Sequence, residues 1–102
     1  MKNDMESSIN ELAERAYHTA IRRGKVKQGK IEHNDTVSSL GEEYLELILA
    51  NESIQSEHLP SVSQVVEELT DIAIGCMTEL FCRGVDVEKM LKMKIEYNEK
   101  RK

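Results

Sequence analysis

Hydrophobic residues recur every three or four positions in four stretches of the chain, the spacing of an amphipathic helix. The first stretch runs from Ser8 to Arg23, and Gly24 after it is typical of a helix end. The second starts near Asp35 or Thr36, either of which can cap a helix N-terminus, and fades at Asn51. Both stretches predict helices.

The third and fourth stretches carry their own start and stop signals. After Pro60, Ser61 and Gln64 have the spacing of a capping box, which predicts the start of a third helix that ends before Gly84. Asp86 is then expected to cap a fourth helix that ends near Lys100.

Few residues interrupt these helical patterns: the chain of 102 residues has one Pro and five Gly. We therefore predict a single all-α domain over residues 1–102, built like a four-helix bundle. The second and third helices are joined by a short polar link and are expected to pack as an antiparallel hairpin. The third helix is apolar over more of its surface than a small monomer can cover, which predicts a homo-oligomer.

Composition narrows the function. There are 14 Lys and Arg against 19 Asp and Glu, a net charge of −5, and aromatic residues make up 4%. This acidic, aromatic-poor chain does not suit nucleic-acid binding. No window approaches the roughly 18 consecutive apolar residues of a membrane span, and the N-terminus lacks the apolar run of a signal peptide. We expect a cytoplasmic protein in which Cys76 and Cys82 are buried, reduced thiols.

Two acidic pairs stand out on the helices expected to form the hairpin. Glu43 and Glu46 are three positions apart on the second helix, and so are Glu68 and Asp71 on the third. Each pair therefore lies on one helix face, and in an antiparallel hairpin the four carboxylates can converge. Converging anions repel one another unless a cation lies among them. Oxygen ligands without Cys or His favour Mg²⁺, with Mn²⁺ as the alternative.

The same spacing also arises on solvated helix faces. Glu11 with Glu14 and Glu96 with Glu99 are two further pairs that we interpret in this way. What distinguishes Glu68 and Asp71 is their apolar surroundings, where unpaired charge is costly. A di-iron bundle is disfavoured because none of the three histidines follows a glutamate by three positions.

Near the C-terminus, Lys94, Asn98 and Arg101 are spaced to share one helix face. A cation, an amide and a guanidinium suit phosphate oxygens, although positive charge is also favourable at any helix C-terminus. Residues 24–30 match a P-loop in part, but Ile31 stands where a P-loop needs Ser or Thr. Whether the basic loop 24–35 closes over a substrate stays open.

Taken in order, these motifs resemble those of the MazG-like all-α nucleoside triphosphate pyrophosphatases, which include dimeric dUTPases and phosphoribosyl-ATP pyrophosphohydrolases. The similarity covers roughly residues 36–102. It rests on EYLE at 43–46, on ELTD at 68–71, and on a later segment in which Lys94, Asn98 and Arg101 match the family pattern.

The resemblance implies a magnesium-dependent enzyme that cleaves a nucleoside or deoxynucleoside triphosphate to the monophosphate and pyrophosphate. The metal ligands would then be Glu43, Glu46, Glu68 and Asp71. The contacts to the triphosphate would be made by Lys94, Asn98 and Arg101. Either Glu43 or Glu46 can serve as the base that activates water. The alternative is a non-catalytic helical dimerisation module of the same fold.

Overall fold

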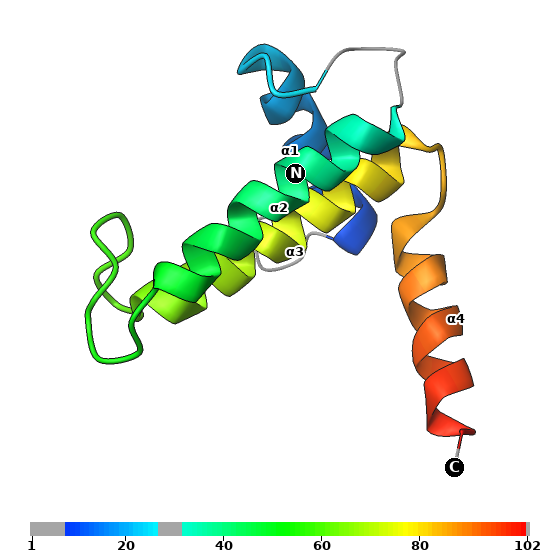
Figure 1. Ribbon diagram of the computed structural model, residues 1–102. Helices are drawn as coiled ribbons and strands as arrows, with labels where there is room; N and C mark the ends of the chain where they lie inside the picture. The colour runs from blue at the N-terminus through cyan, green and yellow to red at the C-terminus, as the bar shows by residue number, and fades with distance from the viewer. Residues whose placement is uncertain (1–7, 27–31, 102) are drawn as a thin grey trace. The chain divides into compact units, whose positions relative to one another are not determined.

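The computed structural model describes residues 8–26 and 32–101. They form four α-helices: α1 (Ile9–Arg22), α2 (His33–Leu49), α3 (Gln64–Cys82) and α4 (Val87–Glu99) (Figure 1). The described ranges contain no strand, and their one β-bridge joins Gln55 and Ser63. The prediction of an all-α chain with four helices is confirmed.

The predicted signals at the ends of α1 and α4 act as expected. Asp86 caps α4, since its carboxylate accepts a hydrogen bond from the Lys89 backbone N–H at 3.0 Å. Gly24 and Gly84, which follow α1 and α3, both have φ of +73°, a conformation that glycine adopts without steric cost.

The predicted start of α2 is wrong. The helix begins at His33 with Glu32 at the N-cap position, before Asp35 and Thr36. Glu32 makes no side-chain cap. Its backbone carbonyl accepts a hydrogen bond from the Thr36 hydroxyl at 3.3 Å, so Thr36 lies inside the first turn. The sequence could not indicate this start, because Glu32 is not one of the residues that commonly cap a helix.

The capping box predicted for α3 is also displaced. Ser63, not Ser61, accepts a hydrogen bond from the Val66 backbone N–H, at 3.2 Å, and the helix begins at Gln64. The cause is the preceding loop, in which the Ser56 N–H donates to the Val62 carbonyl at 2.9 Å. This pairing keeps the backbone near Ser61 out of helical conformation.

The chain divides into two compact units, one of residues 31–76 and the other of residues 1–30 and 77–102. The first holds α2 and most of α3, and the second holds α1, the end of α3, and α4. The prediction of a single domain over residues 1–102 stays a prediction.

In the unit of residues 31–76, α2 and α3 lie side by side and run in opposite directions, as an antiparallel hairpin (Figure 1). The two helices approach closely at Gly75, where an added Cβ would lie 3.2 Å from Leu40 Cδ2. A hydrogen-bonded loop, residues 50–63, connects them. Its backbone is tied to α3 where the Gln64 N–H donates to the Ile54 carbonyl at 2.9 Å.

In the other unit, α1 packs against the start of α4. The Asn10 side-chain amide donates to the Asp86 carboxylate at 2.8 Å, and its oxygen accepts from the Glu88 backbone N–H at 3.0 Å. Ala13 and Val87 are fully buried. These contacts make Asn10 a second cap for α4, contributed from a distant part of the sequence.

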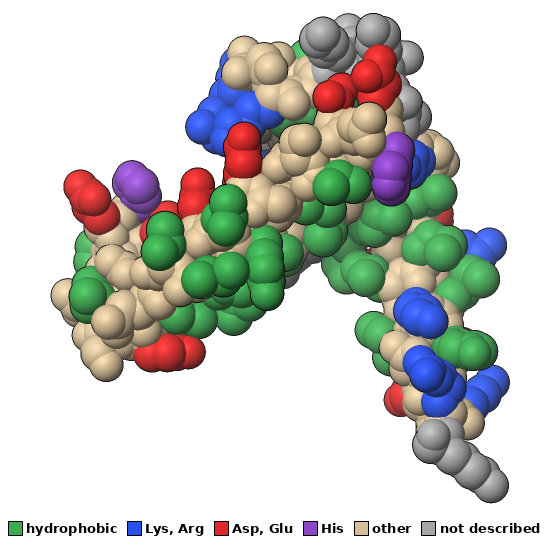
Figure 2. Space-filling model, viewed as in Figure 1, with side chains coloured by type: hydrophobic (Ala, Val, Ile, Leu, Met, Phe, Trp, Pro, Cys, Tyr) green, Lys and Arg blue, Asp and Glu red, His purple; other side chains and the backbone are tan. Residues whose placement is uncertain are grey.

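Much apolar surface of the α2–α3 hairpin is exposed, and no residue of α2 is buried by the described part of the chain. Figure 2 shows hydrophobic side chains gathered over the hairpin. Among the exposed ones are Tyr44, Leu45, Ile48, Leu49, Val66 and Leu69. None of the helices in the described ranges combines the length and the apolar character needed to cross a lipid bilayer.

Candidate metal centre

The structure brings together the four acidic residues that the sequence singled out. Glu43 and Glu46 project from α2, and Glu68 and Asp71 project from α3. Each residue offers one carboxylate oxygen, and these four oxygens all lie within 4.8 Å of one another. Glu46 is exposed and the other three are half-buried. We call these four residues the acidic cluster.

The acidic cluster perturbs the pKa of one of its members, Glu68. The pKa of Glu68 is raised, first by burial and then by a hydrogen bond with Glu46 that requires Glu68 to keep its proton. The charges of Glu46, Asp71 and Glu67 raise it further. Among the residues that the structure describes, the Glu68 Oε2 oxygen is buried without a hydrogen-bond partner. A cation among these oxygens would favour the ionised form of Glu68 and would give its Oε2 oxygen a partner.

The donor set fits Mg²⁺ or Mn²⁺. All four groups are hard carboxylate oxygens, and neither Cys nor His belongs to the cluster, which disfavours zinc. Acidic side chains often gather on protein surfaces without an ion. This cluster differs because three of its members are half-buried and an oxygen of Glu68 lacks a partner.

A pocket of about 280 Å³ opens beside the acidic cluster, within the same compact unit. Glu46 and Glu68 belong to both the cluster and the pocket wall. The pocket is lined by Glu46, Leu49, Ala50, Glu57, His58, Gln64, Glu67 and Glu68. A molecule in this pocket therefore contacts the acidic cluster on one side and the loop of residues 50–63 on the other.

Glu67 forms one wall of the pocket and joins α3 to the loop. One of its oxygens accepts a short hydrogen bond from the Ser56 hydroxyl, and the other lies 3.2 Å from His58 Nδ1. Ser56 is only 2% exposed. The pKa of Glu67 is lowered, chiefly by the Ser56 hydrogen bond and also by His58, against the opposing effect of burial. The lowered pKa favours the ionised form of Glu67.

This loop contact escaped the sequence analysis. Ser56 and His58 precede Glu67 by 11 and 9 positions, too far apart for any helical or turn motif to link them. For His58 the sequence indicates only that no glutamate lies three positions before it. Glu67 belongs to neither of the acidic pairs that the sequence predicts to converge.

The predicted phosphate-contacting residues lie on α4 and just after it. Lys94, Asn98 and Arg101 are all exposed. Lys94 Nζ lies 4.5 Å from the centre of the Tyr97 ring, and Arg101 Cζ lies 5.8 Å from it, so both cations stack on one aromatic side chain. These residues belong to the other compact unit, and their contact with a substrate at the acidic cluster stays a prediction.

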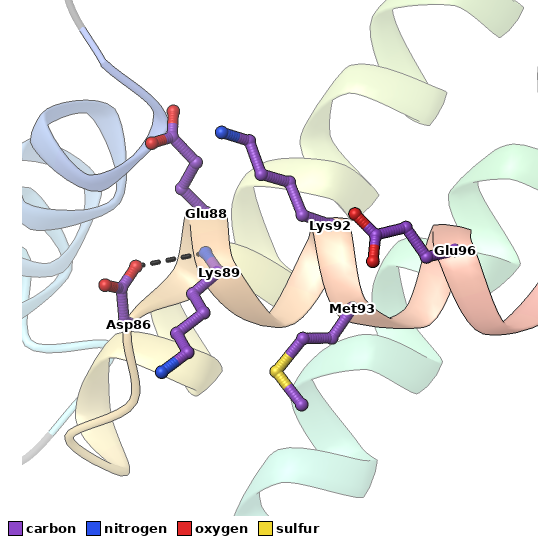
Figure 3. A pocket seen from close by; sticks show the side chains of 6 residues that line it. All are labelled: Asp86, Glu88, Lys89, Lys92, Met93 and Glu96. Carbon is purple, nitrogen blue, oxygen red and sulfur yellow. Dashed lines mark hydrogen bonds between the residues drawn. The ribbon is translucent and has the colours of Figure 1, made fainter.

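A second hollow, of about 310 Å³, lies along the first half of α4 (Figure 3). It is lined by Asp86, Glu88, Lys89, Lys92, Met93 and Glu96. Three acidic and two basic side chains line it, and none of the predicted phosphate-contacting residues takes part. We interpret it as the solvated charged face of α4.

Two other expectations have different outcomes. Cys76 and Cys82 are both free thiols, but Cys76 is exposed and Cys82 is half-buried, so the expectation that both are buried is wrong. The helix turns Cys76 outward because Thr78 and its neighbours take the inner positions. The basic loop 24–35 includes residues 27–31, which lie outside the described residues.

No protein-family model matches this chain, and no curated protein or solved structure matches it either. The residues and their geometry are therefore the basis for a functional assignment.

Proposed function

We propose that this chain is a magnesium-dependent nucleoside triphosphate pyrophosphohydrolase of the MazG-like type. The observation that carries the proposal is the acidic cluster, whose four oxygens lie within 4.8 Å of one another at the positions of the E-x-x-E and E-x-x-D motifs. An acidic pair on a single helix is common. Two pairs that converge between antiparallel helices, around a Glu68 oxygen without a partner, are far more specific.

In this function Glu43, Glu46, Glu68 and Asp71 hold Mg²⁺, or Mn²⁺ in its place. When bound, the metal offsets the negative charge of the triphosphate oxygens. Glu46 and Glu68 also line the neighbouring pocket, so this pocket is the part of the site that receives the substrate. Lys94, Asn98 and Arg101 contact the triphosphate.

The reaction is an attack of water on the α-phosphorus. A new bond forms between the water oxygen and this phosphorus, and the bond from the α-phosphorus to the oxygen that bridges it to the β-phosphorus breaks. Pyrophosphate leaves, and the proton of the water passes to a base. Within the acidic cluster, the sequence offers Glu43 and Glu46 for this role, and Glu46 is the more exposed of the two.

A second copy of the chain completes the molecule in this proposal. The exposed hydrophobic side chains of the hairpin include Leu49, which is 83% exposed, and α2 buries no residue. A stable soluble monomer rarely leaves so much apolar surface open. The protein would therefore be a homodimer or a homotetramer that acts in the cytoplasm.

The same exposed surface favours the second candidate, a non-catalytic helical dimerisation module. The two candidates differ in their response to nucleotide, because only an enzyme site gains affinity for Mg²⁺ together with a nucleoside triphosphate. A rise in melting temperature with Mg²⁺ and a non-hydrolysable triphosphate, larger than with Mg²⁺ alone, supports the enzyme.

The deciding experiment measures pyrophosphate release from canonical and modified nucleoside triphosphates, with Mg²⁺ and with EDTA. We expect release that EDTA abolishes and that Asp71→Asn reduces by at least about 100-fold. Glu42→Gln is the control, since Glu42 is an exposed acid on α2, beside Glu43, that does not belong to the acidic cluster. Folded protein that releases no pyrophosphate from any substrate would contradict the proposal.

A further inference from the structure

The pocket beside the acidic cluster contains one nitrogen base. Among the described residues that line the pocket, His58 is the one histidine. A neutral imidazole has one ring nitrogen that can accept a proton. Glu46 and Glu68 line the same pocket, so His58 and two members of the acidic cluster border one space.

His58 contacts α3 through Glu67. Its Nδ1 atom lies 3.2 Å from Glu67 Oε2, and the other oxygen of Glu67 accepts a hydrogen bond from the Ser56 hydroxyl. The Ser56 oxygen in turn accepts from the Leu59 backbone N–H at 3.0 Å. Glu67 is thus held from the loop side, and it holds the imidazole.

The same contact sets the tautomer. An ionised carboxylate only accepts hydrogen bonds, so Nδ1 of His58 must carry the hydrogen that lies between them. In the neutral ring the lone pair is then on Nε2, the nitrogen that Glu67 does not contact. A base oriented by a carboxylate through its second nitrogen is the arrangement that enzymes use to activate a nucleophile.

Resting on the proposed function, we infer that His58 is the general base of the hydrolysis. Nε2 takes a proton from the attacking water while the water oxygen bonds to the α-phosphorus, and pyrophosphate leaves with the electrons of the broken bond. The imidazolium then returns the proton to solvent. This assignment frees Glu43 and Glu46 to act as metal ligands. The charged groups that line the pocket with His58 are Glu46, Glu57, Glu67 and Glu68.

The kinetic test compares His58→Asn with the matched control His33→Asn, a second exposed histidine that lies outside the pocket. At saturating Mg²⁺ we expect His58→Asn to lower kcat by about 100-fold or more, with little change in KM and in the Mg²⁺-induced rise of the melting temperature.

Chemical rescue and NMR provide independent readouts. The His58 side chain is 81% exposed, so added imidazole should restore part of the activity of His58→Gly. Nitrogen-15 NMR of the metal-free protein should show His58 with its hydrogen on Nδ1, and Glu67→Gln should shift the ring toward the other tautomer.

The outcomes separate the two proposals. If the wild type releases pyrophosphate but His58→Asn keeps its kcat, the role of His58 is overturned and the enzyme assignment stands. A hydrogen on Nε2 in the wild type also overturns that role. If the wild type releases no pyrophosphate, both proposals fail.

Discussion

Glu68 on α3 is hydrogen-bonded to Glu46 on α2, across the hairpin, and this bond helps burial to raise the pKa of Glu68. Such a bond favours the form of Glu68 that carries a proton. A divalent cation can take the place of that proton. Mg²⁺ binding is therefore expected to release protons and to weaken as the pH falls.

Mg²⁺ should stabilise the wild-type protein through the acidic cluster. At a concentration of 100 times Kd the expected gain in the free energy of unfolding is about 2.7 kcal/mol. Asp71→Asn removes one ligand charge and should abolish most of this gain, whereas Glu42→Gln should retain it. Thermal melts with and without Mg²⁺ measure both. Equal gains in the two variants would show that the ion binds elsewhere.

Glu67 and Glu68 are adjacent, yet they should respond to pH in opposite directions. The folded-state pKa of Glu68 is raised, so its ionisation destabilises the metal-free fold as pH rises above its unfolded value of 4.5. The folded-state pKa of Glu67 is lowered, so it contributes stability above 4.5 that is lost as pH falls through its folded value.

At pH 7 without metal, Glu68→Gln should therefore raise the free energy of unfolding and Glu67→Gln should lower it. Urea titrations of both variants at pH 7 and at pH 4 check the signs, and both effects should shrink at the lower pH. Destabilisation by Glu68→Gln at pH 7 would argue that repulsion in the acidic cluster is already relieved.

Two helical glycines offer a matched pair for the packing of the hairpin. A Cβ at Gly41 meets nothing within 4 Å, whereas a Cβ at Gly75 lies 3.2 Å from Leu40 Cδ2. Gly41→Ala should stabilise the protein by about 0.5–1 kcal/mol through helix propensity. Gly75→Ala should gain less, because Leu40 must move. Denaturant titrations of both variants measure the change in the free energy of unfolding. An equal increase in both would contradict the expected cost of moving Leu40.

The exposed hydrophobic side chains of the hairpin should bury themselves against a second copy. Light scattering should give the mass of a dimer or a tetramer for the wild type. Ile48→Lys places a charge among these side chains and should shift the protein toward the monomer at micromolar concentration. Ser39→Lys, an exposed polar position on the same helix, is the control. A monomeric wild type would contradict oligomerisation.

The predictable parts of this structure are those set by local spacing. The helical period located all four helices, and the predicted cap Asp86 accepts from the Lys89 backbone N–H, three residues away. The acidic cluster could be predicted because Glu43 and Glu46, like Glu68 and Asp71, are three residues apart, and because the two helices were assumed to pack antiparallel.

Two of the differences from the sequence-based expectations originate in the loop of residues 50–63. Its bridge between Gln55 and Ser63 moved the cap of α3, and its hydrogen bonds to Glu67 built a pocket wall from residues with no short-range pattern. The start of α2 was missed for a different reason, since Glu32 begins the helix without a side-chain cap.

The Ser56 hydrogen bonds also bear on what binding costs. A loop of this length would ordinarily lose conformational entropy when a ligand orders it, and that loss would subtract from the affinity. Here the Ser56 side chain joins Leu59 to Glu67, and the backbone of Ser56 is bonded to Val62 before any ligand arrives. In the proposed function, the pocket wall that a nucleotide would meet is therefore ordered before binding, and its binding energy would be available for choosing between substrates.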